Sequence, residues 1–250
     1  MAEHDDWKLR YSRHLALPGF GAPAQARLAA ATVLVVGLGG LGSPAALYLA
    51  VAGVGRLLLN DFDKVDMSNL QRQILYRDAD VGTPKPQAAA KTLAGINPGP
   101  ALEQLSGRLD EAGLAQVIRR CDLVLDGSDN FGTRFAVNKA CVAAGKPLVS
   151  GAAIRYQGQL AVFDRRDAAS PCYACLYQET GEELEDCQRN GVLAPLTGVM
   201  GSLMAVEALK LLTGTGESLT GRLLRYDALT GDFRYTTVKR DPACPVCKHP

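Results

Sequence analysis

Histidine is scarce in this sequence, and net charge is almost absent. The three histidines, His4, His14 and His249, all lie close to the ends of the chain, which argues against a histidine-based catalytic triad in its central part. Lysine and arginine together number 27, and aspartate and glutamate 26. The resulting net charge of +1 offers no electrostatic basis for nucleic acid or an anionic membrane as the main partner.

Long apolar runs, repeats and linkers are missing as well. No run of about eighteen apolar residues occurs, and residues 1–10 are mostly polar, so the sequence predicts neither a transmembrane helix nor a signal peptide. We therefore expect a cytoplasmic protein. With 47% hydrophobic and 21% charged residues, the composition is that of a soluble protein with a sizeable core. Nothing in it divides residues 1–250 into separate domains.

Cysteine, by contrast, is well represented, with seven residues. Disulfides are not expected in a reducing cytoplasm. Four of the cysteines form two C-x-x-C pairs, Cys172 with Cys175 and Cys244 with Cys247. Four thiolates suit a tetrahedral zinc site, and a site without an open ligand position is structural rather than catalytic. The pairs are too far apart for an ordinary zinc finger, so zinc would join distant segments. Two independent thiol pairs are the alternative.

The other three cysteines differ in their surroundings. Cys121 and Cys141 lie in apolar segments and are expected in the core. Cys187 is flanked by polar residues, which predicts an accessible thiol.

A glycine-rich turn follows the apolar run Val33–Val36. Gly37, Gly39 and Gly42 form the pattern G-x-G-x-x-G, and a helix pattern begins directly after it. In this context the first glycine allows the turn, the second lets a phosphate approach the backbone, and the third lets helix and strand pack closely. The N-terminus of the helix would attract an anion. The motif thus predicts a nucleotide site, with a tight structural turn as the alternative.

Strand and helix patterns alternate up to about residue 150. Strands are expected at 33–36, 56–61, 101–106, 122–126, 147–150, 158–163, 223–227 and 233–238, and helices at 6–15, 24–30, 44–52, 86–96, 111–119, 131–144 and 196–212. This order predicts an α/β fold, Rossmann-like, with a parallel sheet extended by later antiparallel strands and helices on both faces. Within one domain we expect N-terminal helices (1–31), a nucleotide-binding part (32–150) and a zinc-bearing part (151–250).

Three side chains near the turn distinguish between nucleotides. Asp61 ends the second strand, where an acidic residue binds a ribose. Arg72 and Lys85 belong to or border the long polar segment 63–84, and a loop of that length is usually functional. A triphosphate needs such cations more than the diphosphate of NAD does, so ATP is favoured. Taken singly, Asp61 also fits a strand-end turn, and the two cations fit a solvated surface.

Asp129 follows another buried strand. The carboxyl end of such a strand lies over the ligand crevice of α/β proteins, and Mg²⁺ prefers one or two carboxylates together with phosphate oxygens. Asp129 is therefore a candidate Mg²⁺ ligand. The alternative is that Asp129 or Asn130 caps the helix that begins near Phe131.

Taken together, these motifs resemble a known family, the bacterial ubiquitin-activating-like adenylyltransferases (MoeB/ThiF/HesA). The resemblance spans nearly the whole chain. It is carried by Arg10–His14, the glycine turn, Asp61–Asp63, Ser68–Gln73, Lys85, Asp126–Asn130, Val149–Ala153, Gly191–Gly201 and the paired C-x-x-C motifs.

The resemblance implies adenylation, with ATP and Mg²⁺, of the C-terminal glycine of a small ubiquitin-like sulfur carrier ending in Gly-Gly, with release of pyrophosphate. It also implies a homodimer. Gly40, Asp61, Asn69, Arg72, Lys85, Asp129 and Asn130 would bind the nucleotide, Asp129 would hold Mg²⁺, and the four paired cysteines would hold Zn²⁺. Arg13 would reach the phosphates bound to the other subunit. Arg13, Arg72, Lys85 and Asp129 would be the catalytic residues.

Cys187 matches the cysteine of the family's crossover loop, expected at about 176–193, where some members form a covalent intermediate with the carrier. No sulfurtransferase domain is recognisable, so sulfur would come from a separate cysteine desulfurase or rhodanese. Ala194–Leu196 favours a MoaD-type carrier of molybdenum cofactor biosynthesis over a ThiS-type carrier. An NAD-dependent oxidoreductase and a non-catalytic carrier-binding scaffold remain as alternatives.

Overall fold

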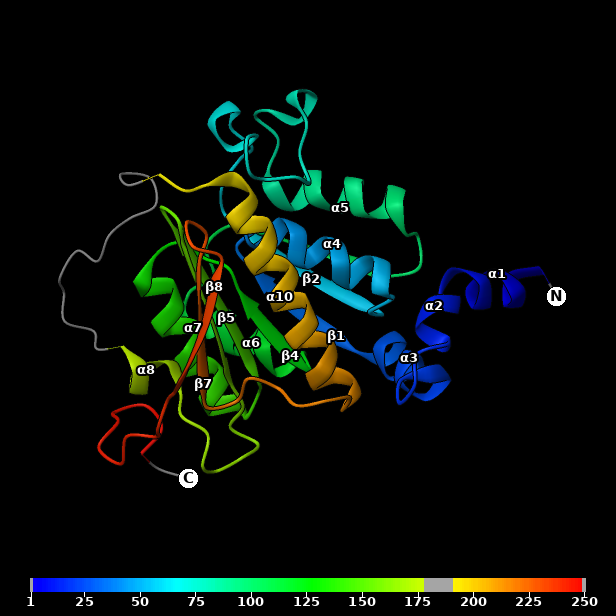
Figure 1. Cartoon of the computed structure of the whole chain (residues 1–250). Coiled ribbons are helices and arrows are strands. Elements are labelled where there is room, and N and C mark those ends of the chain that lie inside the picture. Colours follow the sequence, from blue (N-terminus) through cyan, green and yellow to red (C-terminus); the bar gives the residue numbers. More distant parts are fainter. Residues whose placement is uncertain (1, 178–190, 249–250) are drawn as a thin grey trace.

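The computed structural model describes residues 2–177 and 191–248. In these parts eight strands form one mixed sheet in the order β3-β2-β1-β4-β5-β6-β7-β8 (Figure 1). The five strands from β3 to β5 run parallel, and β6 to β8 continue the sheet antiparallel. The strands are β1 (Thr32–Val36), β2 (Arg56–Asp61), β3 (Ala101–Ser106), β4 (Leu123–Asp126), β5 (Leu148–Ile154), β6 (Gln157–Phe163), β7 (Arg222–Asp227) and β8 (Asp232–Thr237).

Helices cover both faces of the sheet (Figure 1). The helices are α1 (Ala2–Arg10), α2 (Ser12–Leu15), α3 (Gly21–Ala30), α4 (Gly42–Ala52), α5 (Lys85–Ile96), α6 (Glu111–Arg119), α7 (Phe131–Ala144), α8 (Tyr173–Leu176) and α10 (Ala194–Thr213). Helices α3, α4, α5 and α10 share one core cluster with the sheet, and α6 and α7 share the other. The predicted fold, including the parallel-to-antiparallel change, is confirmed.

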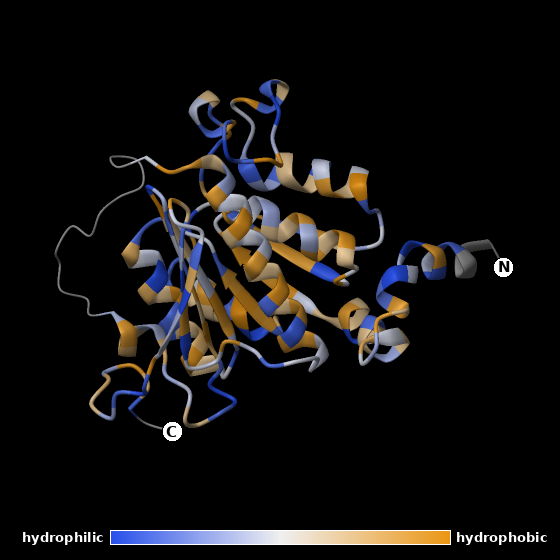
Figure 2. Cartoon of the chain, viewed as in Figure 1, coloured by the Kyte–Doolittle hydropathy of each residue, from blue (hydrophilic) through white to orange (hydrophobic). Residues whose placement is uncertain are grey.

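The central strands are buried on both faces, which explains their apolar sequences. Along β1, Val33 and Val35 face one cluster while Leu34 and Val36 face the other, as the two-residue period of a strand requires. Figure 2 shows the inner strands as mainly hydrophobic ribbons between the helices.

Most element boundaries lie within three residues of the expectation, and two differences are larger. The predicted helix 6–15 is divided at Tyr11, whose buried hydroxyl accepts a hydrogen bond from Asn97 at 2.9 Å. β5 runs on to Ile154 because it pairs with β6 as far as Gln157, and the tight connection is made at Arg155 with φ +52°.

α10 is the one described helix that is long and apolar enough to cross a membrane by length and composition. Half of its apolar window is buried inside the protein, and it packs on α4, β5 and β6. Figure 1 shows it lying across the sheet. It therefore has the packing of a core helix.

Candidate functional site

A cavity of about 230 Å³ opens at the carboxyl ends of β1 and β4. β1 lies between β2 and β4, so the chain winds away from it in both directions. Ligands of doubly wound sheets bind at such a switch point. The lining combines polar or charged side chains with apolar ones, and it includes Asp61, Phe62, Asp63, Arg72, Gln73, Lys85, Arg108, Leu109, Leu114, Asp129, Asn130, Arg134 and Thr197.

The glycine turn forms the floor of this cavity. Gly37 has φ +81°, which favours glycine. A Cβ at Gly42 would collide with the carbonyl group of Gly37, so the third glycine is needed for close packing of helix and strand. A Cβ at Gly40 would lie 3.1 Å from three side-chain atoms of Thr197 in α10. Space above the turn is therefore limited by α10, a contact that the motif alone does not predict.

The Leu38 peptide within the turn is fixed by three partners. Its N–H donates to Asp61 Oδ2 at 2.8 Å, and its carbonyl accepts from Ser43 Oγ at 3.1 Å and from the Tyr76 hydroxyl at 2.9 Å. Burial raises the pKa of Tyr76 far above its usual range, so this hydroxyl remains a donor. The sequence analysis missed Ser43 and Tyr76, since nothing local marks them as partners of Leu38.

Asp61 and Lys85 meet at the end of β2. Asp61 is 8% exposed and also accepts the N–H of Asp63 at 2.8 Å. Burial raises the pKa of Asp61, although the charge of Lys85 and the two backbone bonds oppose this shift. Lys85 Nζ lies 3.0 Å from Asp63 Oδ2 and 3.9 Å from Asp61 Oδ2, and the lysine is 5% exposed. A buried cation thus borders the cavity beside two acidic side chains.

The segment between β2 and α5 contributes Arg72 and Gln73. Arg72 lines the cavity, and its Nη1 donates to the Ser68 carbonyl at 3.1 Å. Asn69 does not belong to the lining; its carbonyl accepts the N–H groups of Arg72 and Gln73 at 3.1 and 3.0 Å. Asn69 therefore shapes the turn that presents the two side chains.

Gln73 was not among the predicted site residues. It is 4% exposed and lines the cavity, and its Oε1 has no hydrogen-bond partner within the described residues. Phe62 and Arg108, also missed, stack at the cavity with the guanidinium carbon 4.5 Å from the ring centroid. Their positions in the sequence could have indicated a place in the site, because Gln73 follows Arg72 and Arg108 follows the carboxyl end of β3.

The two candidates for capping α7 are now distinguished. Asn130 is the cap, since its Oδ1 accepts the Thr133 N–H at 2.9 Å. Asp129 is exposed and lines the cavity, and no hydrogen bond or ion pair holds its carboxylate in the described parts of the chain. The carboxylate of Asp129 is thus available to a cation in the cavity.

Arg13 lies elsewhere. It is exposed on α2 and does not line the cavity. Figure 1 shows α1 to α3 grouped at the end of the sheet where β1 begins, whereas the cavity opens where β1 ends. The structure of one chain therefore does not bring Arg13 to its own cavity.

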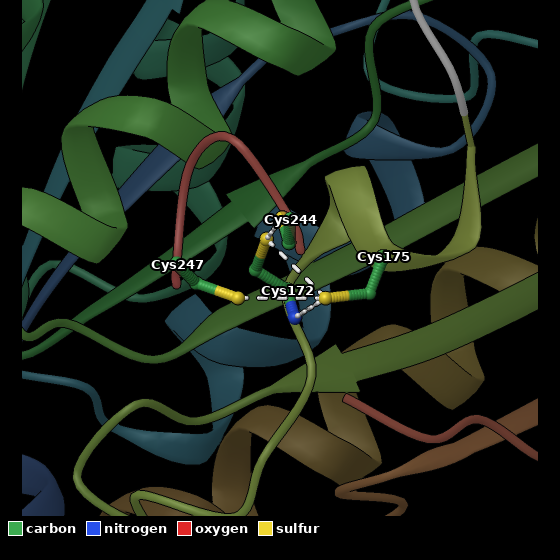
Figure 3. A group of neighbouring side chains, drawn as sticks. All are labelled: Cys172, Cys175, Cys244 and Cys247. Carbon is green, nitrogen blue, oxygen red and sulfur yellow. Dashed lines mark hydrogen bonds between the residues drawn. The ribbon is translucent and has the colours of Figure 1, made fainter. Parts of the chain in front are cut away.

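The four paired cysteines converge, as predicted. Cys172 and Cys175 come from the start of α8, and Cys244 and Cys247 from the C-terminal segment; Figure 3 shows their sulfur atoms facing one another. All four Sγ atoms lie within 4.8 Å of each other. Cys172 Sγ is 3.7 Å from Cys244 Sγ, and Cys175 Sγ is 3.4 Å from Cys247 Sγ.

The three remaining cysteines have separate outcomes. Cys121 and Cys141 are buried core residues, as predicted. Burial raises the pKa of the Cys121 thiol to about 12 and so disfavours its thiolate form. Cys187 and most of the expected crossover loop lie outside the described residues.

The fold and the cavity define a doubly wound α/β protein with its site at the switch point of the sheet. The chain belongs to the ThiF family, whose model matches residues 11–246. It is 50% identical to the molybdopterin-synthase adenylyltransferase of Escherichia coli K12, over 99% of both chains. It is 47% identical to the sulfur carrier protein adenylyltransferase of Thermus thermophilus, over 95% of this chain and 90% of that one.

A solved structure shares the fold. A crystal structure of E. coli MccB with MccA-N7isoASN superposes with a TM-score of 0.85 at 24% identity, covering 97% of this chain and 75% of that chain. The family predicted from the motifs is confirmed.

Proposed function

We propose that this protein is an adenylyltransferase that uses ATP to adenylate the C-terminal glycine carboxylate of a small ubiquitin-like sulfur carrier. The carrier would be of the MoaD type, and the product would serve sulfur transfer in molybdenum cofactor biosynthesis. One observation carries the proposal: Arg72, Lys85 and the unpaired carboxylate of Asp129 line the same switch-point cavity as the glycine turn. The likeness to the E. coli adenylyltransferase over almost the whole chain supports it.

The reaction joins two anions, and this determines what the site must supply. A C-terminal carboxylate is ionised at neutral pH, so it needs no general base before it attacks the α-phosphorus of ATP. The obstacle is the charge of the triphosphate, and the main contributions are positioning and electrostatic stabilisation. Arg72 and Lys85 would neutralise phosphate oxygens and the leaving pyrophosphate. Gly40 and the turn would seat the phosphates, and Asp61 would bind the ribose.

We assign Mg²⁺ to Asp129. An exposed carboxylate that has no protein partner and faces the cavity fits an ion that binds through one or two carboxylates and phosphate oxygens. The ion would reduce the charge of the triphosphate. Asn130 would keep the turn in place through its cap of α7, and Asn69 would act through the backbone turn that it shapes.

We assign Zn²⁺ to the cysteine cluster. Zn–S bonds of about 2.3 Å in a tetrahedron place the sulfur atoms about 3.8 Å apart. The observed separations of 3.4, 3.7 and 4.0 Å fit this arrangement. The N–H groups of Cys172 and Asp241 approach Cys175 Sγ at 3.5 Å, as is usual around metal-bound thiolates. The ion would fasten the C-terminal segment to α8.

The remaining parts of the proposal concern partners and location. We propose a cytoplasmic homodimer in which Arg13 reaches the site of the other subunit, and a separate cysteine desulfurase or rhodanese as the sulfur donor. Cys187 would serve the later sulfur-transfer step rather than adenylation. Residues 151–250 would form the carrier-binding and zinc-bearing part.

ATP–pyrophosphate exchange with purified carriers tests the proposal. We expect exchange with a MoaD-type carrier, little exchange with a ThiS-type carrier, and none with a MoaD-type carrier lacking its last glycine. Asp129→Asn should reduce exchange at least about a hundredfold, whereas Asp78→Asn, an exposed carboxylate outside the cavity, should leave it unchanged.

The controls decide between the alternatives. Exchange with ThiS alone would change the proposed carrier. Carrier binding without any exchange would favour a scaffold, and binding of NADH in place of ATP would favour an oxidoreductase.

A further inference from the structure

Polar side chains recur every four residues along α7 and link the two functional regions. Asn130 caps the helix, Arg134 reaches the Ser128 carbonyl, and Asn138 reaches the start of α8. Residues four apart in a helix lie on the same side. This side of α7 therefore connects the turn that bears Asp129 with the segment that bears the first two cysteines.

Arg134 holds the cavity end of this connection. Its Nε and Nη2 both donate to the Ser128 carbonyl, at 3.1 and 2.6 Å, and Nη2 also lies 3.3 Å from the Gly151 carbonyl of β5. Asp126 supports the same turn, because its Oδ1 accepts the Ser128 N–H at 3.0 Å and the Ser128 hydroxyl at 2.6 Å. The N–H and the carbonyl of Ser128, the residue directly before Asp129, are thus both fixed by hydrogen bonds.

The buried carboxyl group of Asp126 gives Arg134 a second role. Asp126 is fully buried, and its Oδ2 has no hydrogen-bond partner among the described residues. Burial raises the pKa of Asp126, and the charge of Arg134 is the main factor opposing the rise. Arg134 therefore acts as a forked donor to the Ser128 carbonyl, and its charge also favours the ionised form of the inaccessible Asp126 carboxyl group.

Asn138 holds the other end. It is 1% exposed. Its Oδ1 accepts the Tyr173 N–H at 2.9 Å, and its Nδ2 points to Cys172 Sγ at 3.6 Å. A donor to a ligating sulfur orients that ligand. Tyr173 also packs edge-on against Phe135, which lies one turn before Asn138 in α7, with ring centroids 5.3 Å apart. These contacts fix α7 and α8 to one another.

We propose that α7 couples the four-cysteine cluster to the Mg²⁺–nucleotide turn, with Arg134 and Asn138 as positioning residues. The coupling rests on the proposed function, since it requires ATP and Mg²⁺ to bind at Asp129. Coupling between two sites is reciprocal. Binding of ATP and Mg²⁺ at the nucleotide site should therefore stabilise the metal-bound cysteine cluster. An intact cluster should in turn strengthen nucleotide binding.

Release of zinc to an excess of a colorimetric chelator tests the coupling without an activity assay. Zinc content and ATP binding are measured first, by elemental analysis and equilibrium dialysis. Saturating ATP with Mg²⁺ should slow zinc release from the unaltered protein about fivefold or more. Asn138→Ala and Arg134→Lys should reduce this protection to less than about twofold at an ATP concentration that saturates each variant.

Lys139→Ala is the matched control, because Lys139 is the next residue of α7 and its exposed side chain pairs, among the described residues, only with Glu111 on the surface. It should retain full protection. Equal protection in every variant, or ATP binding without protection in the unaltered protein, would overturn the coupling. Absence of ATP binding would instead contradict the proposed function. If the protein is isolated without metal, the rate at which the thiols react with a disulfide reagent replaces zinc release in the same comparison.

Discussion

Asp129 and Asn130 are adjacent in the sequence and have separate tasks in the structure. Asn130 caps α7 and Asp129 faces the cavity. Asn130→Ala should therefore lower the free energy of unfolding by about 1 kcal/mol, the usual value of a cap. Asp129→Asn should change it by less than about 0.5 kcal/mol. Urea unfolding without nucleotide measures both; an equal loss in the two variants would contradict the division of tasks.

At this scale the sequence identifies residues by type and spacing, but not their partners. Gly37, Asp61, Arg72 and Lys85 all line the cavity, and Gly37 and Asp61 do so because the motif fixes where the first two strands end. The cap could not be assigned, since both Asp and Asn favour that position. Gln73 and Tyr76, as well as Arg134, were missed because their roles depend on contacts with Gly39, Leu38 and Ser128 that only the folded chain brings about.

Elements were predicted well where local pattern and packing agree. Strand β2 and helices α6 and α7 have the predicted bounds, each between a clear start and stop signal. The extension of β5 to Ile154 was not predictable locally, because it results from antiparallel pairing with β6. The convergence of the cysteine pairs was predicted from ligand chemistry rather than from secondary structure.

The contact between α10 and the glycine turn gives a prediction at the scale of the element. A Cβ at Gly201 would collide with the carbonyl oxygen of Leu41 and with Pro44, so Gly201→Ala should destabilise the protein by about 1–3 kcal/mol and weaken ATP binding. Gly198 lies one turn earlier in α10 with nothing within 4 Å of such a Cβ. Gly198→Ala should therefore be neutral or stabilise by up to about 1 kcal/mol. Thermal unfolding compares the two, and equal effects would refute the packing argument.

The position of Arg13 bears on how two copies of the chain would assemble. A residue expected at the phosphates lies on α2, away from the cavity of its own chain. If it acts, the site must be completed by a second copy, which carries Arg13 to the cavity from outside. The role of Arg13 was inferred from the resemblance to the family. Neither the spacing of the residues nor the fold of one chain indicates it.

Mixing two inactive variants tests the exchange of Arg13 between subunits. Arg13→Ala and Asp129→Asn should each lose most of the carrier-dependent exchange when assayed alone. A mixed dimer has one site with both defects and one with none, because the intact Arg13 and the intact Asp129 meet in the same site. Equal mixing followed by subunit exchange should thus recover about a quarter of the unaltered activity, as two-fold symmetry dictates. Mixing Arg13→Ala with itself is the control for concentration. No recovery, despite mixed dimers shown by mass spectrometry of differently tagged chains, would place the action of Arg13 within its own chain or outside the reaction.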